Sequence, residues 1–139
     1  MARAFLDANI LFSAAYRTSA GLRRLWLLPE VELCASPYAI EEARHNLDTS
    51  VQRAELDGLI KQLNVVADAT SIDHPIFQQI TLPPKDRPIL LTAVSASATH
   101  LLTGDMRHFG PFYGQRILGV LIQPPAAFIR ELTVDAAEE

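Results

Sequence analysis

The sequence predicts an α/β fold, a three-layer α/β/α sandwich around a central parallel sheet. Short apolar segments that read as buried strands, such as 2–6 and 99–103, alternate along the whole chain with segments of helical apolar spacing. This alternation is typical of βαβ units with right-handed crossovers. The chain has 139 residues, of which 49% are hydrophobic. We therefore expect a single domain over 1–139, in which 133–139 is a frayed acidic tail.

In the first half of the chain, capping residues and prolines mark where the helices begin and end. Pro29 ends the second helix, Ser36 and Pro37 begin the third, and Thr49 with Gln52 has the spacing of a capping box. The elements expected here, in order, are a strand at 2–6, helices at 8–16 and 21–28, a strand at 31–35, and helices at 36–47 and 49–63.

In the second half, Pro83 and Pro84 stop the chain before a stretch that reads as acid, helix, strand and acid. Asp86 opens the helix, and Gly104 with Asp105 ends the strand. The expected elements are an edge strand at 65–66, a short helix after 74–75, a helix from 86, a strand at 99–103, a loop at 110–114, one strand at 117–122 interrupted only by Gly119, and a helix from 124 to 132.

Composition excludes several classes of protein. The only cysteine is Cys34, so no disulfide can form within the chain, and we expect a reducing, cytoplasmic location. No apolar run reaches transmembrane length, and the N-terminus lacks the pattern of a signal peptide. The net charge of −4 argues against a non-specific nucleic-acid binder, unless carboxylates hold cations that reverse the local field.

Carboxylates follow two of the expected strands directly. Asp7 and Asp105 come at strand ends, which lie at the same edge of a parallel sheet. Carboxylates at one edge repel each other unless a cation or a proton lies between them, and oxygen ligands favour Mg²⁺ or Mn²⁺ over zinc. The alternative is that Asp7, Asp86 and Asp105 only cap helices, although capping does not exclude coordination.

A further acid lies in the helix that follows Ser36. On a helical wheel, Glu42 is nearer the small-residue edge of this helix, and Glu41 points further from the apolar face. The wheel does not decide between them. Two adjacent glutamates are also the ordinary content of a solvated helix face.

These residues carry a resemblance to a known family. Over nearly its whole length the chain resembles the PIN-domain nucleases, through FLDANILFSA, SPYAIEEARHNL, KDRPILLTAVSASATHLLTGDMRHF and GVLIQPPAAFI. The acids of the family pattern correspond to Asp7, Glu42, Asp86 and Asp105, which selects Glu42 over Glu41. The supporting polar positions correspond to Asn9 and Thr103, and no acidic position is missing.

The resemblance implies a ribonuclease that hydrolyses phosphodiester bonds with Mg²⁺ or Mn²⁺ held by the four acids. Asn9 and Thr103 would orient the carboxylates, and the substrate would be single-stranded or structured RNA. The chain is also similar to the VapC-like toxins of toxin–antitoxin pairs, which implies an antitoxin partner. We expect no membrane partner. The apolar helix at 21–28 either packs against a second copy or an antitoxin, or is buried within the domain.

Positive residues flank the acids and are expected to hold the nucleic-acid backbone. They are Lys85, Arg87, Arg107 and Arg44, together with His108 beside Arg107. The alternative is ordinary surface charge. The four histidines (His45, His74, His100 and His108) show no paired metal-ligand spacing, and His100 is expected to be a packed core residue.

Three other functions compete with the toxin. A receiver-like or dehalogenase-like phosphoryl-transfer protein also places an Asp after its first strand, but Lys85 comes before a helix rather than after a strand. A catalytically idle domain that only binds RNA or protein would be expected to lose an acid, and none is lost here. A housekeeping RNA-processing nuclease would share every feature of the site.

Overall fold

The protein is built around one six-stranded sheet in the order β3-β2-β1-β4-β6-β5. A computed structural model describes residues 1–17 and 21–138. The strands are β1 (Ala2–Leu6), β2 (Val31–Ala35), β3 (Asn64–Val65), β4 (His100–Leu102), β5 (Arg116–Ile117) and β6 (Val120–Gln123). All neighbouring strands are parallel except β5 and β6. The predicted α/β fold with a mainly parallel sheet is confirmed.

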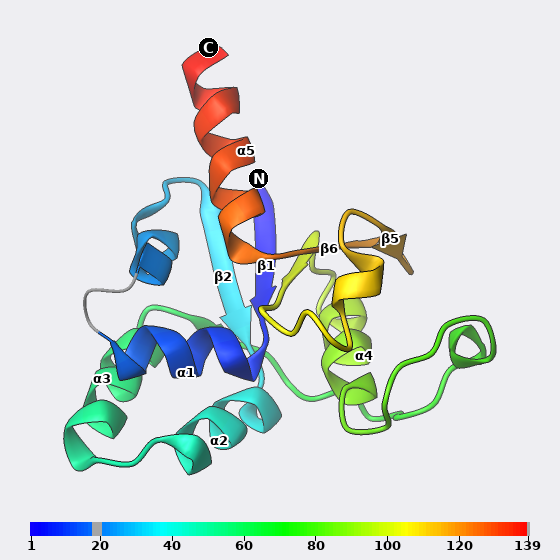
Figure 1. Cartoon of the computed structure of the whole chain (residues 1–139), viewed down its shortest axis with the longest axis horizontal. Coiled ribbons are helices and arrows are strands. Elements are labelled where there is room, and N and C mark those ends of the chain that lie inside the picture. The colour runs from blue at the N-terminus through cyan, green and yellow to red at the C-terminus, as the bar shows by residue number, and fades with distance from the viewer. Residues whose placement is uncertain (18–20, 139) are drawn as a thin grey trace.

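Helices lie on both sides of this sheet. They are α1 (Ala8–Tyr16), η1 (Gly21–Leu27), α2 (Pro37–Asn46), α3 (Ser50–Ile60), η2 (Pro75–Gln78), α4 (Arg87–Ser95), η3 (Gly110–Phe112) and α5 (Pro125–Glu138). Figure 1 shows α1, α2 and α3 grouped together, α4 apart from them, and α5 projecting beyond the rest of the chain. Within the described ranges, no helix is long and apolar enough to span a membrane.

The capping hydrogen bonds that the sequence predicted are present at the starts of α2 and α3. The Ser36 side chain accepts a hydrogen bond from the backbone N–H of Ala39 at the start of α2. Thr49 and Gln52 form a full capping box at the start of α3. The polar cap and the apolar spacing therefore predict the same boundaries, and both α2 and α3 are confirmed.

Two elements differ from the expectation. The segment expected as a helix at 21–28 is the 3₁₀ helix η1, whose Leu25 is buried in the core. Leu22 within η1 and Leu28 just after its end are partly buried and pack against the same core. The spacing of three between these leucines matches the period of a 3₁₀ helix rather than that of an α-helix. The terminal helix α5 continues past Leu132 to Glu138, through most of the expected tail, and residue 139 lies outside the described residues.

The prediction of one strand over 117–122 was wrong, because this segment is a hairpin. β5 and β6 pair antiparallel across a turn at Leu118 and Gly119, whose φ angles are 52° and 85°. Two successive positive φ angles are typical of a type I′ turn, whose twist matches that of the flanking strands. Gly119 was therefore a turn residue rather than an interruption of a strand.

The order of the strands creates a switch point at the centre of the sheet. From β1 the chain moves to β2 and β3 on one side, and it then returns to β4 on the other side of β1. Phe5, Leu6, Leu101 and Leu102 of these central strands have no exposed surface and anchor the core. In open parallel sheets, ligands bind beyond the carboxyl ends of the strands at such a switch point.

Candidate functional site

A cavity of about 440 Å³ opens at this switch point. Its lining residues are Asp7, Ala8, Asn9, Phe12, Glu42, Asn46, Lys85, Asp86, Gly104 and Asp105. The structure therefore brings together the four acids singled out in the sequence, although they are spread over nearly a hundred positions of the chain.

Asp7 follows β1 and is both a helix cap and part of the cavity wall. It is 5% exposed, and its Oδ1 accepts a 2.7 Å hydrogen bond from the backbone N–H of Ala8. Burial raises the pKa of Asp7 from 3.8 to about 6; the Thr103 hydroxyl and the Ala8 N–H lower it, whereas the charges of Asp86 and Glu42 raise it further. Asp7 thus caps the helix and lines the cavity at the same time.

Asn9 and Thr103 connect Asp7 to the end of β4. The fully buried Thr103 donates from Oγ1 to Asp7 Oδ2 over 2.9 Å, and the same Oγ1 accepts from the backbone N–H of Asp105 over 3.1 Å. Asn9 Nδ2 donates to Asp7 Oδ2 over 3.1 Å, and Asn9 Oδ1 accepts from the N–H of Gly104 over 2.8 Å. The ends of the two central strands are therefore joined by side-chain hydrogen bonds.

Gly104 makes this close approach feasible. A Cβ atom at this position would lie only 3.3 Å from Asn9 Oδ1. Because Asn9 is held by hydrogen bonds to both strand ends, it has little freedom to move away.

Asp86 precedes α4, but its side chain makes no capping hydrogen bond. The alternative interpretation of Asp86 as a simple cap was therefore wrong. It is 9% exposed, and burial raises its pKa; the charges of Lys85 and His108 lower it, and that of Asp105 raises it. This carboxylate is buried at the site without serving the helix, which is unusual unless a ligand or a cation uses it.

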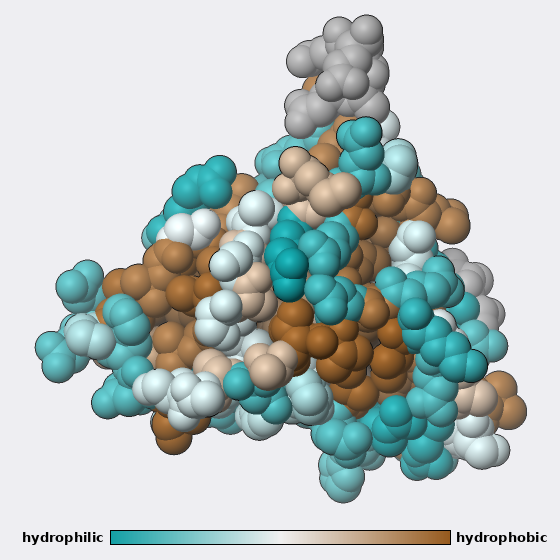
Figure 2. All heavy atoms as spheres, turned by 180° about the vertical axis from the view of Figure 1, so that it is seen from behind, coloured by the Kyte–Doolittle hydropathy of each residue, from teal (hydrophilic) through white to brown (hydrophobic). Residues whose placement is uncertain are grey.

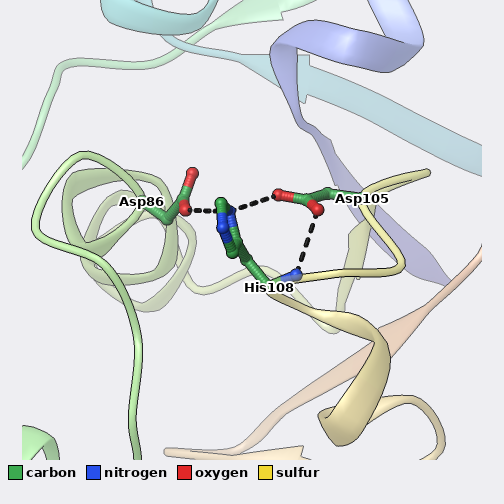
Figure 3. A group of neighbouring side chains, drawn as sticks. All are labelled: Asp86, Asp105 and His108. Atoms are coloured by element: carbon green, nitrogen blue, oxygen red, sulfur yellow. Dashed lines mark hydrogen bonds and ion pairs between the residues drawn. The ribbon is translucent and has the colours of Figure 1, made fainter.

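Asp105 is held by the turn that follows β4. Its Oδ1 accepts from the backbone N–H of His108 over 3.0 Å, so it does cap its own turn. Its Oδ2 lies 3.0 Å from His108 Nδ1. Figure 3 shows the His108 ring between Asp105 and Asp86, and Nδ1 is also 3.0 Å from Asp86 Oδ2.

His108 is the residue of this site that the sequence reasoning did not place among the acids. Spacing typical of paired metal ligands was absent, and the available signal was only its position three residues after Asp105. The two 3.0 Å contacts meet the distance of an ion pair. Among the described residues, however, neither buried atom, Asp86 Oδ2 or His108 Nδ1, has a hydrogen-bond partner of good geometry.

Glu42 projects from α2 and lies at the rim of the cavity. Its residue is exposed, unlike Asp7 and Asp86. Glu41 lies instead 3.8 Å from Arg44, measured between carboxylate oxygen and guanidinium nitrogen. The structure thus places Glu42, and not Glu41, beside the other acids.

Of the four lysine and arginine side chains expected to hold the nucleic-acid backbone, Lys85 lines the cavity. Arg44 pairs with Asp57 over 2.8 Å. Arg87 donates from Nε to the carbonyl oxygen of Leu82 over 2.9 Å, and its guanidinium lies 4.9 Å from the centre of the Phe77 ring. Arg107 is exposed on the turn beside Asp105. Arg44 and Arg87 therefore have structural partners within the chain.

The donor set fits a hard divalent cation. It consists mainly of carboxylate oxygens, and one of them, Asp86 Oδ2, is buried without a good hydrogen bond to any residue within 1–17 and 21–138. The ligand atoms of Asp86, Asp105 and His108 lie within 4.8 Å of one another. Oxygen-rich sites of this kind suit Mg²⁺ and Mn²⁺.

Comparison with known proteins agrees with this architecture. No curated protein matches the chain. Among solved structures, VapBC2 from Rickettsia felis bound to a DNA fragment from its promoter is 16% identical with a TM-score of 0.67, over 88% of this chain and 98% of that one. A toxin–antitoxin complex from Klebsiella pneumoniae is 21% identical with a TM-score of 0.63, over 85% and 95%.

A third structure is VapC20 from Mycobacterium tuberculosis, described as a sarcin-ricin loop cleaving toxin. It is 10% identical with a TM-score of 0.54, over 73% of this chain and 91% of that one. These likenesses show the fold. The family model of the PIN domain matches residues 3–107, from the strand before Asp7 to the turn after Asp105. The chain therefore belongs to the PIN domain family.

Proposed function

We propose that this protein is a divalent-metal-dependent endoribonuclease and the toxin of a toxin–antitoxin pair. The observation that carries the proposal is the convergence of Asp7, Glu42, Asp86 and Asp105 on one cavity at the switch point of the sheet. Two of these acids, Asp7 and Asp86, are buried and have raised pKa values. Buried carboxylates with shifted pKa values in a cleft are typical of functional sites.

The four acids would hold one or two cations, while Thr103 and Asn9 fix the orientation of the Asp7 carboxylate. When bound, Mg²⁺ or Mn²⁺ lowers the pKa of a water molecule and neutralises charge on the phosphate. Lys85, beside Asp86 at the cavity, would contact a backbone phosphate of the substrate. Arg107, exposed on the neighbouring turn, extends this positive surface.

The proposed substrate is RNA, single-stranded or structured. The support is the fold shared with VapC20, which is described as cleaving the sarcin-ricin loop. Hydrolysis of this type does not require a 2′-hydroxyl, so DNA is a necessary comparison substrate.

The proposed partner is an antitoxin protein, because two of the structural neighbours are described as a VapBC complex and a toxin–antitoxin complex.

Figure 2 shows apolar surface in the middle of one face, with hydrophilic residues around it. Leu27 of η1 is 80% exposed. Apolar surface of this kind marks sites of protein contact, so a homodimer is a second expected assembly. The complex would act in the cytoplasm.

An idle binding domain would have no need of these acids. Burying Asp7 and Asp86 is unfavourable for their charged forms, and a domain that only binds RNA or protein gains nothing from that cost. A housekeeping RNA-processing nuclease shares the same site. Growth arrest on expression of the chain, relieved by an antitoxin encoded directly upstream, would favour the toxin.

Cleavage of a labelled RNA tests the proposal. Wild type and Asp7→Asn are incubated with Mg²⁺, with Mn²⁺ and with a chelator, and a DNA of the same sequence is the comparison. We expect the wild type to cut the RNA only when a metal ion is present, and we expect Asp7→Asn not to cut it. Cutting that survives the chelator or the substitution would contradict the assignment.

A further inference from the structure

We propose that His108 is a protein ligand of the divalent cation through Nδ1, together with Asp86 Oδ2 and Asp105 Oδ2, and that this mixed site favours Mn²⁺ over Mg²⁺. The inference rests on the metal dependence in the proposed function, to which it adds a residue and a cation preference. It departs from a site made of four carboxylates alone.

The distances fit coordination. His108 Nδ1 lies 3.0 Å from Asp86 Oδ2 and 3.0 Å from Asp105 Oδ2. Neighbouring ligands of an octahedral ion with bonds of about 2.1 Å lie about 3 Å apart. Figure 3 shows one carboxylate on each side of the ring, Asp86 from the start of α4 and Asp105 from the turn after β4.

Hydrogen bonding within the protein does not explain the arrangement. An imidazole nitrogen carries at most one hydrogen, so Nδ1 can donate to only one of the two oxygens at a time. Asp86 Oδ2 and His108 Nδ1 are both buried without a partner of good geometry in the part of the chain that the structure describes, and Asp86 as a residue is 9% exposed. Buried polar atoms without partners are costly, and a cation between the three atoms would satisfy them together.

The turn holds His108 in this position. The backbone N–H groups of Phe109 and Gly110 donate to the carbonyl oxygen of Asp105, and that of His108 donates to Asp105 Oδ1. Phe109, the next residue, has no exposed surface and anchors the turn in the core. The backbone of His108 is therefore fixed by contacts that do not depend on the imidazole, which starts from a defined position beside Asp86 and Asp105.

A nitrogen ligand changes which cation binds best. Mg²⁺ takes oxygen ligands, whereas first-row transition metals also bind nitrogen, and among them Mn²⁺ is the one that suits the carboxylates of this site. Replacing His108 by Gln should therefore weaken Mn²⁺ binding by about tenfold or more and affect Mg²⁺ less. His108→Asp should restore binding with a preference shifted toward Mg²⁺.

Pulsed electron paramagnetic resonance of bound Mn²⁺ tests the proposal directly. A directly coordinated imidazole gives ¹⁴N modulation, which we expect in the wild type and not in His108→Gln. The matched control is His45→Gln, because His45 is an exposed histidine on α2, the helix that carries Glu42. This control should keep the signal.

The outcomes separate this inference from the proposed function. Bound Mn²⁺ without ¹⁴N modulation in the wild type, or modulation that persists in His108→Gln, would overturn the role of His108 and leave the nuclease proposal standing. No Mn²⁺ binding at all would overturn both. If His108→Gln fails to fold, the wild-type spectrum still tests the proposal, because the absence of ¹⁴N modulation would overturn it, and His108→Asp serves as the second variant in which modulation should be lost.

Discussion

Thr103 Oγ1 donates a hydrogen bond to Asp7 Oδ2 over 2.9 Å and so joins the end of β4 to the end of β1. The two residues are 96 positions apart in the sequence. Their hydrogen bond lies where the two halves of the sheet diverge, and it lowers the pKa of a carboxyl that burial raises. This contact therefore belongs both to the fold and to the proposed cation site.

Thr103→Val should lower both stability and cation affinity. The substitution keeps the shape of the side chain but removes the donor to Asp7 and the acceptor for the N–H of Asp105. We expect a loss of about 1–3 kcal/mol in the free energy of unfolding. Urea denaturation and Mn²⁺ titration at pH 7.5 measure the two effects. Thr103→Ser keeps the hydroxyl and is the control; equal cation affinity in Ser and Val variants would contradict the role given to the hydroxyl.

Asp7 should make the metal-free protein less stable as the pH rises. Its pKa in the folded state, about 6, is above the 3.8 of an ordinary Asp carboxyl. The stability that protonation contributes is therefore fully present below about pH 4 and is lost as the pH rises through about 6. A shift of this size corresponds to about 2–3 kcal/mol.

The measurement is urea denaturation in a chelator between pH 5 and pH 7.5, for the wild type and Asp7→Asn. As the pH rises across this range, the wild type should lose more of its free energy of unfolding than Asp7→Asn does. Other titrating groups are common to both proteins, so they largely cancel. A difference that stays constant with pH would show that Asp7 is not the group responsible.

A divalent cation should stabilise the chain, because it binds only the assembled site. At a concentration of about 100 times Kd the gain in the free energy of unfolding is about 2.7 kcal/mol. Chelation should remove it, and Asp86→Asn should abolish most of it. Asp48→Asn, at an exposed acid outside the cavity lining, is the control and should keep the full effect. Equal stabilisation of both variants would place the cation elsewhere.

Lys85→Gln and Arg107→Gln should weaken RNA binding and flatten its salt dependence. Each contact between a cation and a phosphate of single-stranded RNA contributes about 0.7 to the slope of log K against log salt concentration. Arg87→Gln should instead lower thermal stability, since Arg87 contacts Leu82 and Phe77 within the chain. Filter binding in a chelator at several salt concentrations measures the effect on RNA binding, and a thermal melt of each variant measures the effect on stability. A salt slope that falls only in Arg87→Gln would reverse the assignment.

Local signals were enough to predict most of the elements. Ser36, Thr49 and Gln52 form the capping contacts that their spacing indicated, and the ends of β1 and β4 were recognisable as buried strands followed by an acid. These patterns depend only on residues that are close in the sequence, so they can be recognised without knowing the tertiary structure. The strand order is different, because pairing of β1 with β4 spans most of the chain and leaves no local trace.

Some features of the site could likewise be predicted from the sequence, and others could not. The residues Asp7, Asp86 and Asp105 stand at element boundaries, and such positions can be read along the sequence. The placement of His108 between Asp86 and Asp105 depends on the course of a turn, and so does the use of Arg87 within the chain. Side-chain direction outside regular elements is set by tertiary contacts that no periodicity reports.

The hairpin between β5 and β6 offers a last prediction, since Gly119 has a φ of 85°. Gly119→Ala should lower the free energy of unfolding by about 1 kcal/mol, because a Cβ is disfavoured in the left-handed region. Gly58→Ala, within α3, should raise it by about 0.5–1 kcal/mol, because alanine favours the helix and nothing lies within 4 Å of the new Cβ. Chemical denaturation of both variants gives the signs. If Gly119→Ala were neutral or stabilising, the hairpin turn would not have the geometry described here.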